Sequence, residues 1–463
     1  MNIRNLIIAS IAVCVATSPS PSQAATPEVT DVTMTQSGAN RLVTITYKLT
    51  EDAVVTLDVQ TNATPNAATG WASIGGEAIC NAQGAVWRKV TSADADGNGN
   101  YTITWRPDLS WVDEFGNGFK IADGCAKAVV TAWSLDNTPN YMVVDISDAA
   151  QPNTQTYYPS AESIPGGILD NDVYRKTAIV MRKIMAKDVV WTMGSTPQET
   201  RNREANREAT HQVTLTNNYY IGVFPVTQSQ WALIQSNNLT PSFYNNVSYS
   251  AMRPVENVCY NEIRNADNTT AANTAYDWPA APNPSSFLGR LRTKTGIDFD
   301  LPSETQWEFA ARAGHGSTMW GDGSAILNTN KDDNLGRLGR YAQNGGKVDN
   351  REPAQSCDAS NGTAIVGTYQ PNSWGLYDMH GNVWELCLDW FTEDITTLEG
   401  KLNIDPSDSS KTLSGAAGSL RVKRGGGWVY DEGINRPAFR NTDTPTERNK
   451  YTGVRLYCTA GLQ

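Results

Sequence analysis

The sequence predicts an α+β protein whose N-terminal part is an all-β sandwich. Between residues 27 and 148, short runs alternate apolar and polar side chains with period two, and turn-forming residues separate them. Beyond residue 179, a few helical patterns stand among short apolar runs and long loops rich in Gly, Asn and Trp. The first pattern is typical of a small immunoglobulin-like sandwich, and the second indicates an α+β domain with an irregular core.

Five runs in the N-terminal region predict the strands of the sandwich: residues 43–47, 54–59, 101–105, 128–133 and 141–144. Residues 149–178 contain three prolines and two adjacent glycines, a composition that predicts a linker. We therefore expect a sandwich over residues 27–148, a linker over 149–178 and a second domain over 179–463.

Three helices are predicted in the second domain. Thr227 with Gln230, and Ser303 with Gln306, each have the spacing of a capping box, and apolar residues at helical spacing follow both. A third helix is predicted from residue 286 to residue 295, because three apolar residues share one side and Gly296 follows as a stop.

The first 24 residues have the pattern of a secretory signal peptide. One cation, Arg4, precedes an apolar run from Leu6 to Val15, and small residues lead to Ala24. This run is shorter than the ~18 apolar residues that a membrane-spanning helix needs, and no later run reaches that length. We expect an exported protein, periplasmic or extracellular, without stable membrane insertion.

Charge and cysteine content limit which partners and which covalent cross-links are expected. The formal net charge of -11, without a basic run, argues against nucleic acid as a partner. Six cysteines remain after the signal peptide, and an oxidising compartment permits disulfides. The expected pairs are Cys80–Cys125, Cys259–Cys357 and Cys387–Cys458, with free buried cysteines as the alternative.

One segment of the sandwich resembles the opening of a calcium loop. Residues 94–100 place Asp and Asn at alternate positions, but Trp105 stands where a closing glutamate would be. A hairpin turn of Gly, Asn and Asp accounts for the same residues, and we favour the turn.

The second domain resembles the formylglycine-generating enzyme, or sulfatase-modifying factor, family in six ordered blocks. These blocks begin near Val190 and end near Cys458, and together they make a chance match improbable. They include residues 191–194 and 211–215, 226–231, 253–257, 301–312, 372–385, and 421–428 with 452–455. The resemblance implies a C-type-lectin-like fold for residues 179–463.

The resemblance also implies an activity, which this sequence does not support. Members that convert a sulfatase cysteine to formylglycine use two cysteines that bind copper(I), because soft thiolates suit that ion. Tyr430 and Asn435 stand at those two positions, and Gly427 replaces the serine of the motif. We therefore expect no copper and no oxidase activity. The alternative is a sulfatase-maturing oxidase with a different metal arrangement.

In the family, residues equivalent to 378–385 form a calcium site. The resemblance implies that Asp378 and Glu385 bind calcium through their side chains, and Gly381 and Val383 through their carbonyls. The spacing alone favours a core turn in which Asp378 accepts backbone N–H groups, and the resemblance shifts the preference to calcium. His380 lies in the same segment, and we expect a hydrogen-bonded or solvent-facing histidine there rather than a zinc ligand.

The remaining hypothesis is a calcium-stabilised domain that binds a protein, a peptide or another surface ligand. The candidate ligand-binding residues are Trp428, Tyr430, Asn435 and Arg440, with the loop 441–449 beside them. Arg424, Arg436 and Arg440 could instead tie loops together, and we favour that role for them. A third hypothesis is a diversified binding surface between residues 429 and 451, as in retroelement-targeted relatives of the fold.

Overall fold

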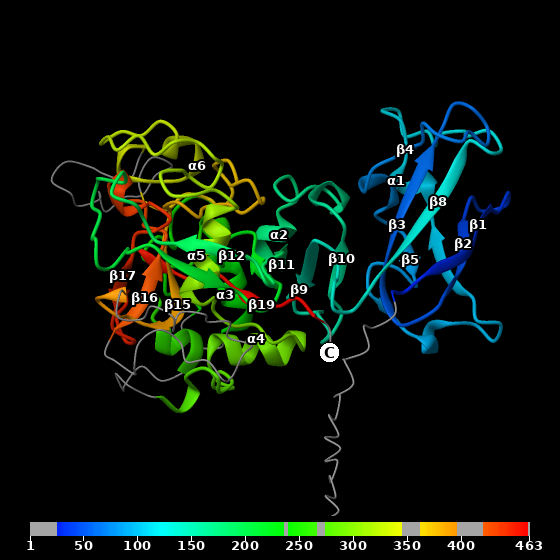
Figure 1. The fold of residues 1–463 in the computed structure, drawn as a ribbon. Coiled ribbons are helices and arrows are strands. Elements are labelled where there is room, and N and C mark those ends of the chain that lie inside the picture. The colour runs from blue at the N-terminus through cyan, green and yellow to red at the C-terminus, as the bar shows by residue number, and fades with distance from the viewer. Residues whose placement is uncertain (1–25, 236–238, 266–273, 345–361, 396–419, 462–463) are drawn as a thin grey trace, which may run out of the picture.

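The computed structural model describes residues 26–235, 239–265, 274–344, 362–395 and 420–461. Two β-rich units lie side by side, and among the described residues every α-helix except a single-turn helix, α1, belongs to the second unit (Figure 1). The predicted α+β class, with an all-β region before the second domain, is confirmed.

The N-terminal unit is a sandwich of two sheets. One sheet has the order β1-β2-β7-β5, and in the other β3 pairs with β4, β6 and β8. The elements are β1 (Val29–Gln36), β2 (Val43–Leu49), β3 (Ala53–Thr61), β4 (Ala72–Ser73), β5 (Gln83–Gly84), β6 (Lys89–Val90), β7 (Tyr101–Trp105), α1 (Pro107–Ser110) and β8 (Ala126–Trp133).

The alternation seen in the sequence matches the faces of these strands. In β2 and β7 every second side chain is buried in the core between the two sheets. Strand β3 differs, because its first five residues are all buried. Val54 packs against residues of the second unit, such as Met142, so both faces of β3 are covered.

The predicted domain boundary differs from the observed one. Residues 141–144, expected in the sandwich, lie in β9 (Tyr141–Asp145), which pairs with β10 (Thr156–Tyr158) and with β11 (Ala178–Ile184). Residues 149–178 therefore contain a strand of the second unit's sheet rather than a free linker. Tyr157 is buried, and its N–H donates to the Trp87 carbonyl at 2.8 Å, which joins the two units.

The second unit contains a five-stranded sheet, a two-stranded ribbon and a four-stranded sheet. The first has the order β10-β9-β11-β14-β19, the ribbon is β12-β13, and the last is β17-β16-β15-β18. The other elements are α2 (Val173–Lys176), β12 (Val190–Met193), β13 (His211–Thr214), β14 (Tyr219–Gly222), α3 (Gln228–Ile234), α4 (Phe287–Thr295), α5 (Glu304–Arg312), α6 (Leu335–Leu338), β15 (Trp384–Trp390), β16 (Arg421–Arg424), β17 (Asn441–Asp443), β18 (Thr452–Gly453) and β19 (Tyr457–Thr459).

The three predicted helices are confirmed as α3, α4 and α5. Thr227 and Ser303 each accept the N–H of the residue three positions on, and both capping boxes are complete. Ser286 caps α4, and Gly296 ends it with φ of 72°. The helix ends could be predicted from the sequence because each depends on residues within one turn of that end.

The cysteines that the structure describes do not form the expected pairs. Cys80 and Cys125 are not bonded to each other, and Cys387 and Cys458 lie in separate apolar clusters. Burial raises the pKa of the Cys387 thiol well above its usual value and raises that of Cys458 as well. For these four residues the free-cysteine alternative holds. The pair Cys259–Cys357 falls outside the described residues, because Cys357 is not among them.

The segment from residue 94 to residue 100 is a turn, as favoured from the sequence. Asp96 accepts the N–H groups of Asn98 and Asn100 at 2.8 and 2.9 Å. Asp94 accepts the Thr91 N–H and pairs with Arg88 instead of pointing toward a shared ion site. The acidic side chains are thus used in holding the turn.

The predicted signal peptide, residues 1–24, lies outside the described residues. Among the residues that the structure does describe, no helix is long and apolar enough to cross a membrane.

Candidate functional site

Two loops that carry the sequence motifs meet beside β15 and β16. The motif loop, residues 378–385, leads into β15, and the glycine loop, residues 425–435, follows β16. The Gly381 N–H donates to the Gly425 carbonyl at 2.7 Å, and the Trp428 N–H donates to the Asn382 carbonyl at 2.9 Å. The antiparallel strands therefore bring together two motifs that are well separated in the sequence.

Gly381 is needed for the shape of the motif loop. Its φ is +105°, and a Cβ atom there would lie 2.2 Å from the carbonyl oxygen of Arg340. Asp378 is buried beneath the loop, where its carboxylate accepts the Gly367 N–H at 2.8 Å and the Asn382 side-chain amide at 3.2 Å. Burial raises the pKa of Asp378 to about 6. This is the core turn that the spacing alone allowed.

Glu385 is the acceptor for a buried arginine. Arg455 donates from Nη2 and Nε to the two Glu385 carboxylate oxygens at 2.7 and 2.8 Å, and Trp307 Nε1 donates at 2.6 Å. Both members of the ion pair have no exposed surface. Glu385 thus joins α5, β15 and the segment before β19.

The two carboxylates of the predicted calcium site already accept hydrogen bonds. Calcium binds through oxygen lone pairs, and N–H groups in this structure point at those same oxygens of Asp378 and Glu385. In this arrangement the two side chains do not fit a calcium ion, although the carbonyls of Gly381 and Val383 lie on the loop between them. Among the residues that the structure describes, no cluster of three or more His, Cys, Asp or Glu side chains could hold a metal ion.

His380 is buried and hydrogen-bonded rather than solvent-facing. Its Nε2 accepts the Gly321 N–H at 3.1 Å, and its ring meets Trp320 edge to face at 5.2 Å. Burial lowers the pKa of His380 to about 4, so the neutral imidazole is present at pH 7. His380 therefore has a structural role, because its ring packs between the motif loop and the neighbouring turn.

Tyr430 and Asn435, which stand at the two cysteine positions, hold the glycine loop together. Asn435 is fully buried, and its side-chain amide donates to the carbonyls of Tyr430 and Asp431 at 3.2 and 2.7 Å. The Tyr430 ring packs against Trp384 and Tyr451, with centroids 5.5 and 5.7 Å away. Neither side chain supplies the sulfur that copper(I) prefers, so the pair does not fit that ion.

Trp428 lies inside the domain and not on a ligand-binding surface. It has no exposed area and packs between Tyr244 and Tyr451, with ring centroids 5.5 and 5.8 Å away. Its indole N–H donates to the Lys450 carbonyl at 3.3 Å. The prediction that Trp428 contacts ligand directly is therefore corrected, because the glycine loop turns this ring into the core.

Arg440 is likewise corrected from a ligand-binding to a structural residue. Its Nε and Nη2 donate to the Glu304 carboxylate at 2.5 and 2.7 Å, and its Nη1 donates to the Thr392 carbonyl at 2.9 Å. Arg440 is buried, and so is Glu304. A fourth hydrogen bond runs from Arg440 Nη1 to the Arg207 carbonyl. Four of the five N–H groups of the Arg440 guanidinium are thus used inside the domain and not offered to a ligand.

The other two arginines near the glycine loop also tie segments together. Arg436 donates to Glu199 and Glu208 at 2.8 Å each, and Arg424 pairs with Glu304 and Glu308. All these side chains are buried. The structural role favoured from the sequence for the arginines agrees with these contacts.

The sequence did not reveal the aromatic cluster around the glycine loop, which consists of Tyr244, Trp428, Tyr430 and Tyr451. Tyr451 precedes the block at 452–455, so its position beside a motif was the one available signal. Tyr244 lies far away in the sequence, and no local pattern indicated it. Phe243, at the edge of the cluster, is 44% exposed.

Residues 176–460 match the family described as "Sulfatase-modifying factor enzyme 1-like domain". The chain is 32% identical over 161 residues to a formylglycine-generating enzyme of Thermomonospora curvata, which covers 34% of this chain and 48% of that protein. It is 37% identical over 95 residues to hercynine oxygenase of Mycobacterium tuberculosis, covering 20% of this chain and 21% of that protein. The chain spans about half the length, or less, of these curated relatives.

Two solved structures are similar to part of this chain. Treponema denticola variable protein 1 is 24% identical, with 61% of this chain and 96% of that chain covered and a TM-score of 0.43. PvdO from Pseudomonas aeruginosa is 21% identical, with 60% and 94% covered and a TM-score of 0.39. Because the family match extends over more than half of the chain, this protein belongs to the sulfatase-modifying factor enzyme 1-like family.

Proposed function

We propose that this chain is an exported member of the family that binds a ligand and does not oxidise cysteine. The observation that carries the proposal is the content of the glycine loop, where Tyr430 and Asn435 occupy the cysteine positions. Both side chains have structural contacts there, and neither supplies a thiolate. A copper(I)-dependent oxidation of a substrate thiol therefore lacks its ligands at this loop.

The other cysteines do not offer a replacement. Cys387 and Cys458 lie in separate apolar clusters, and burial raises the pKa of both thiols. A thiol with a raised pKa is a poor metal ligand and a poor nucleophile, because the thiolate is the reactive form. The buried thiols support a non-oxidase protein.

The names of the relatives also leave the activity of this chain open. Formylglycine-generating enzymes, a hercynine oxygenase and a protein named serine/threonine-protein kinase pkn1 from Chlamydia pneumoniae are each similar to a part of the chain. Since one fold can carry different reactions, the activity must be argued from the side chains of the site rather than from the fold.

The edge of the aromatic cluster is where we place a peptide or surface ligand. Tyr430 and Tyr451 are partly exposed, and Phe243 is 44% exposed beside them. The Lys450 ammonium lies 5.1 Å from the Phe243 ring centroid and 5.6 Å from that of Tyr451. Rigid aromatic rings with a cation at the rim suit recognition of a peptide. A signal peptide over residues 1–24 would deliver this surface to the periplasm or the medium.

The proposal is tested by copper(I) titration of the mature protein, together with mass analysis of a sulfatase-type cysteine peptide after incubation with copper and oxygen. We expect no stoichiometric copper binding and an unchanged peptide mass. The matched control is the double variant Tyr430→Cys with Asn435→Cys, which places a thiol at each family position and should bind copper(I). Formylglycine formed by the unmodified protein would establish the oxidase alternative and overturn the proposal.

A further inference from the structure

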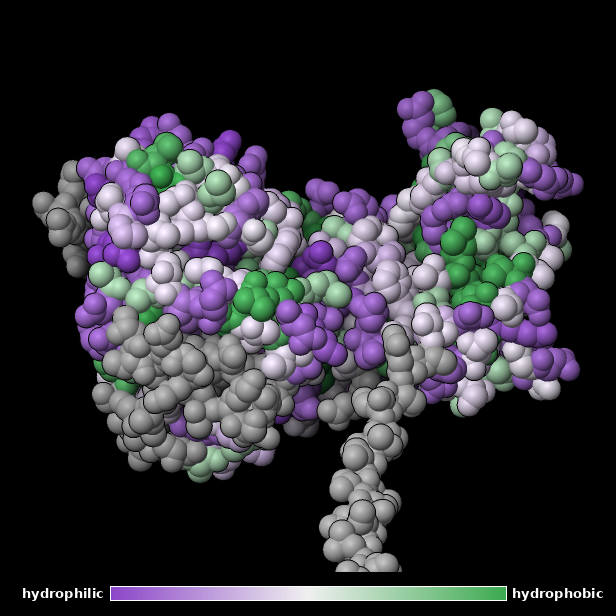
Figure 2. Space-filling view, in the orientation of Figure 1, coloured by the Kyte–Doolittle hydropathy of each residue, from purple (hydrophilic) through white to green (hydrophobic). Residues whose placement is uncertain are grey.

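The N-terminal sandwich, which lies outside the family match, carries an unusual exposed loop. Residues 106–124 connect β7 to β8, and five large apolar side chains on this loop are exposed. They are Leu109 at 66%, Val112 at 37%, Phe115 at 79%, Phe119 at 51% and Ile121 at 40%. Figure 2 shows hydrophobic residues gathered on the visible face of this unit. Such a concentration of exposed apolar side chains marks a site of interaction.

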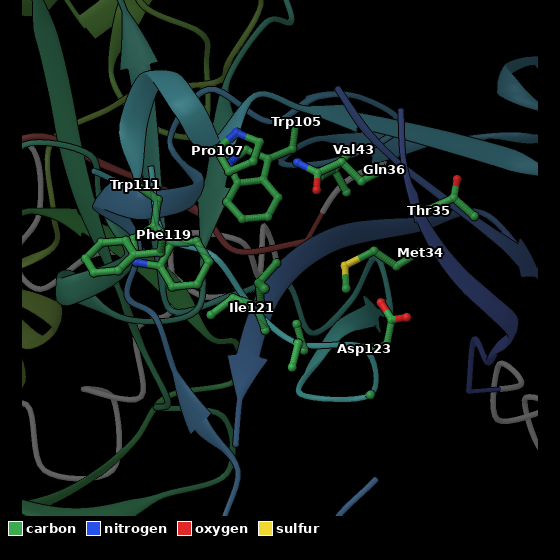
Figure 3. Close-up of a pocket in the computed structure, with 14 residues that line it drawn as sticks. Met34, Thr35, Gln36, Val43, Trp105, Pro107, Trp111, Phe119, Ile121 and Asp123 are labelled. Carbon is green, nitrogen blue, oxygen red and sulfur yellow. The ribbon is translucent and has the colours of Figure 1, made fainter. Parts of the chain in front are cut away.

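Beneath the loop is a pocket with a volume of about 250 Å³. Trp105, Trp111 and Phe119 form a series of rings on one side, with successive centroids 6.1 and 5.0 Å apart. Met34 and Asp123 lie across from the rings in Figure 3, and Ile121 lies between the two sides. The pocket therefore has one wall of adjoining aromatic rings and one of mixed side chains.

Polar groups at the rim of this pocket are available to a ligand. The Asp123 side chain is exposed and lines the pocket, where its carboxylate oxygens can accept hydrogen bonds. Gln36 and Thr35, from the end of β1, line the same pocket. The Gln36 amide uses one N–H in a 3.2 Å bond to the Arg41 carbonyl, and its oxygen faces the pocket side of the strand as an acceptor in Figure 3. The site thus combines ring faces with hydrogen-bonding oxygens.

A second hollow adjoins the first along the same aromatic residues. It has a volume of about 370 Å³ and shares Trp111, Phe119 and Gln36 with the first, while Arg41 and Lys120 line its outer part. Two adjacent hollows that share an aromatic wall suit a ligand made of repeated ring-sized units. A single apolar side chain from a partner would fill one hollow and leave the other unused.

We propose that this double pocket of the N-terminal sandwich binds a neutral oligosaccharide. The C–H faces of sugar rings pack on aromatic side chains, and their hydroxyl groups donate to carboxylate and amide oxygens, which is the combination that Trp111, Phe119 and Asp123 present. Asp123 lines the first hollow, so an anionic glycan would meet a carboxylate there, and the net charge of -11 disfavours nucleic acid and anionic lipid surfaces. The second domain is then held at a glycan-bearing surface by the first.

The test uses the mature full-length protein and soluble neutral tetrasaccharides of glucose, mannose, galactose and N-acetylglucosamine. Calorimetry and saturation-transfer NMR should show saturable binding to at least one of them, with weaker binding of the corresponding monosaccharide because it fills one hollow. Phe119→Ala and Asp123→Asn should each weaken that binding about tenfold. Both side chains are exposed, so neither change removes core packing.

The matched control is Phe115→Ala, which removes an even more exposed phenyl ring from the same loop without altering the lining of either hollow. Its affinity should equal that of the unmodified protein. Absence of saturable binding across the panel would overturn the proposal, as would binding that Phe119→Ala leaves unchanged. Concentration-dependent self-association that Phe119→Ala abolishes would also overturn it, because the apolar loop would then be an interface between copies.

Discussion

Replacing Glu385 with glutamine separates a structural carboxylate from a calcium ligand. In the structure this carboxylate accepts two N–H groups of Arg455 and one of Trp307, all within the core. Glutamine has nearly the same volume, but it removes the charge and turns one acceptor oxygen into a donor that faces other donors. Arg455 keeps its bonds to the carbonyls of Gly222 and Tyr377 at 2.8 and 2.7 Å, so the guanidinium stays buried without its counter-charge.

Breaking a buried ion pair on one side costs about 3–5 kcal/mol of the free energy of unfolding. We expect a loss in this range for Glu385→Gln, measured by urea unfolding of the second domain. The matched control is Glu393→Gln, whose carboxylate pairs with Arg207 but is 67% exposed. Because a solvated ion pair contributes about 1 kcal/mol or less, the control should change little.

The same experiment repeated with calcium and with a chelator decides the role of the carboxylate. If calcium bound the folded state, a free calcium concentration of a hundred times the dissociation constant would raise the free energy of unfolding by about 2.7 kcal/mol. With Glu385 committed to Arg455, we expect the same unfolding midpoint in both solutions. A midpoint that rises with calcium in the unmodified protein, and no longer rises in Glu385→Gln, would refute this reasoning and restore the calcium site implied by the family.

Three further changes have defined outcomes. Burial raises the pKa of Glu256 to about 7 from 4.5, so its contribution to stability is complete below pH 4.5 and is lost as the pH rises through 7. Unfolding free energy should fall by about 3 kcal/mol over that window, and Glu256→Gln should flatten the curve. Arg440→Lys should lower the free energy of unfolding by about 2 kcal/mol, because one ammonium cannot donate to both Glu304 oxygens and two carbonyls. If Arg440 instead bound a ligand, the same change would leave the urea midpoint of the free protein unchanged. Alkylation in denaturant without reductant, followed by mass analysis, should modify Cys80, Cys125, Cys387 and Cys458. A disulfide among them would instead leave two of these cysteines unmodified.

Local features of the fold were predictable because their causes lie close together in the sequence. The capping residues Thr227 and Ser303 begin their helices through bonds to the third residue on, and Gly296 ends one through its own backbone conformation. The domain boundary failed for the opposite reason. Strand β9 is a short run of strand-forming residues that follows the sandwich strands in the sequence, and its pairing with β11 assigns it to the second unit.

The sequence also gave no indication of how deeply the candidate site residues are buried. Nothing in the residues around Trp428 distinguishes a ring that points into the core from one that faces solvent. The partner of Arg440 is Glu304, which precedes it by 136 positions, so no local spacing could reveal the pair. Sequence motifs located the site, whereas the long-range ion pairs determined which side chains remain available.

Buried arginines hold the motif segments of this domain in place without taking part in a reaction. Arg455 with Glu385, and Arg424 and Arg440 with Glu304, join the segments that carry the motif blocks. A loop-rich domain has few regular hydrogen bonds between distant segments, so these directional contacts fix the loops in one arrangement. The positions that could support chemistry, Tyr430 and Asn435, lie within a loop that this frame holds. Their identity can therefore change while the frame stays folded, and family membership identifies the frame rather than the reaction.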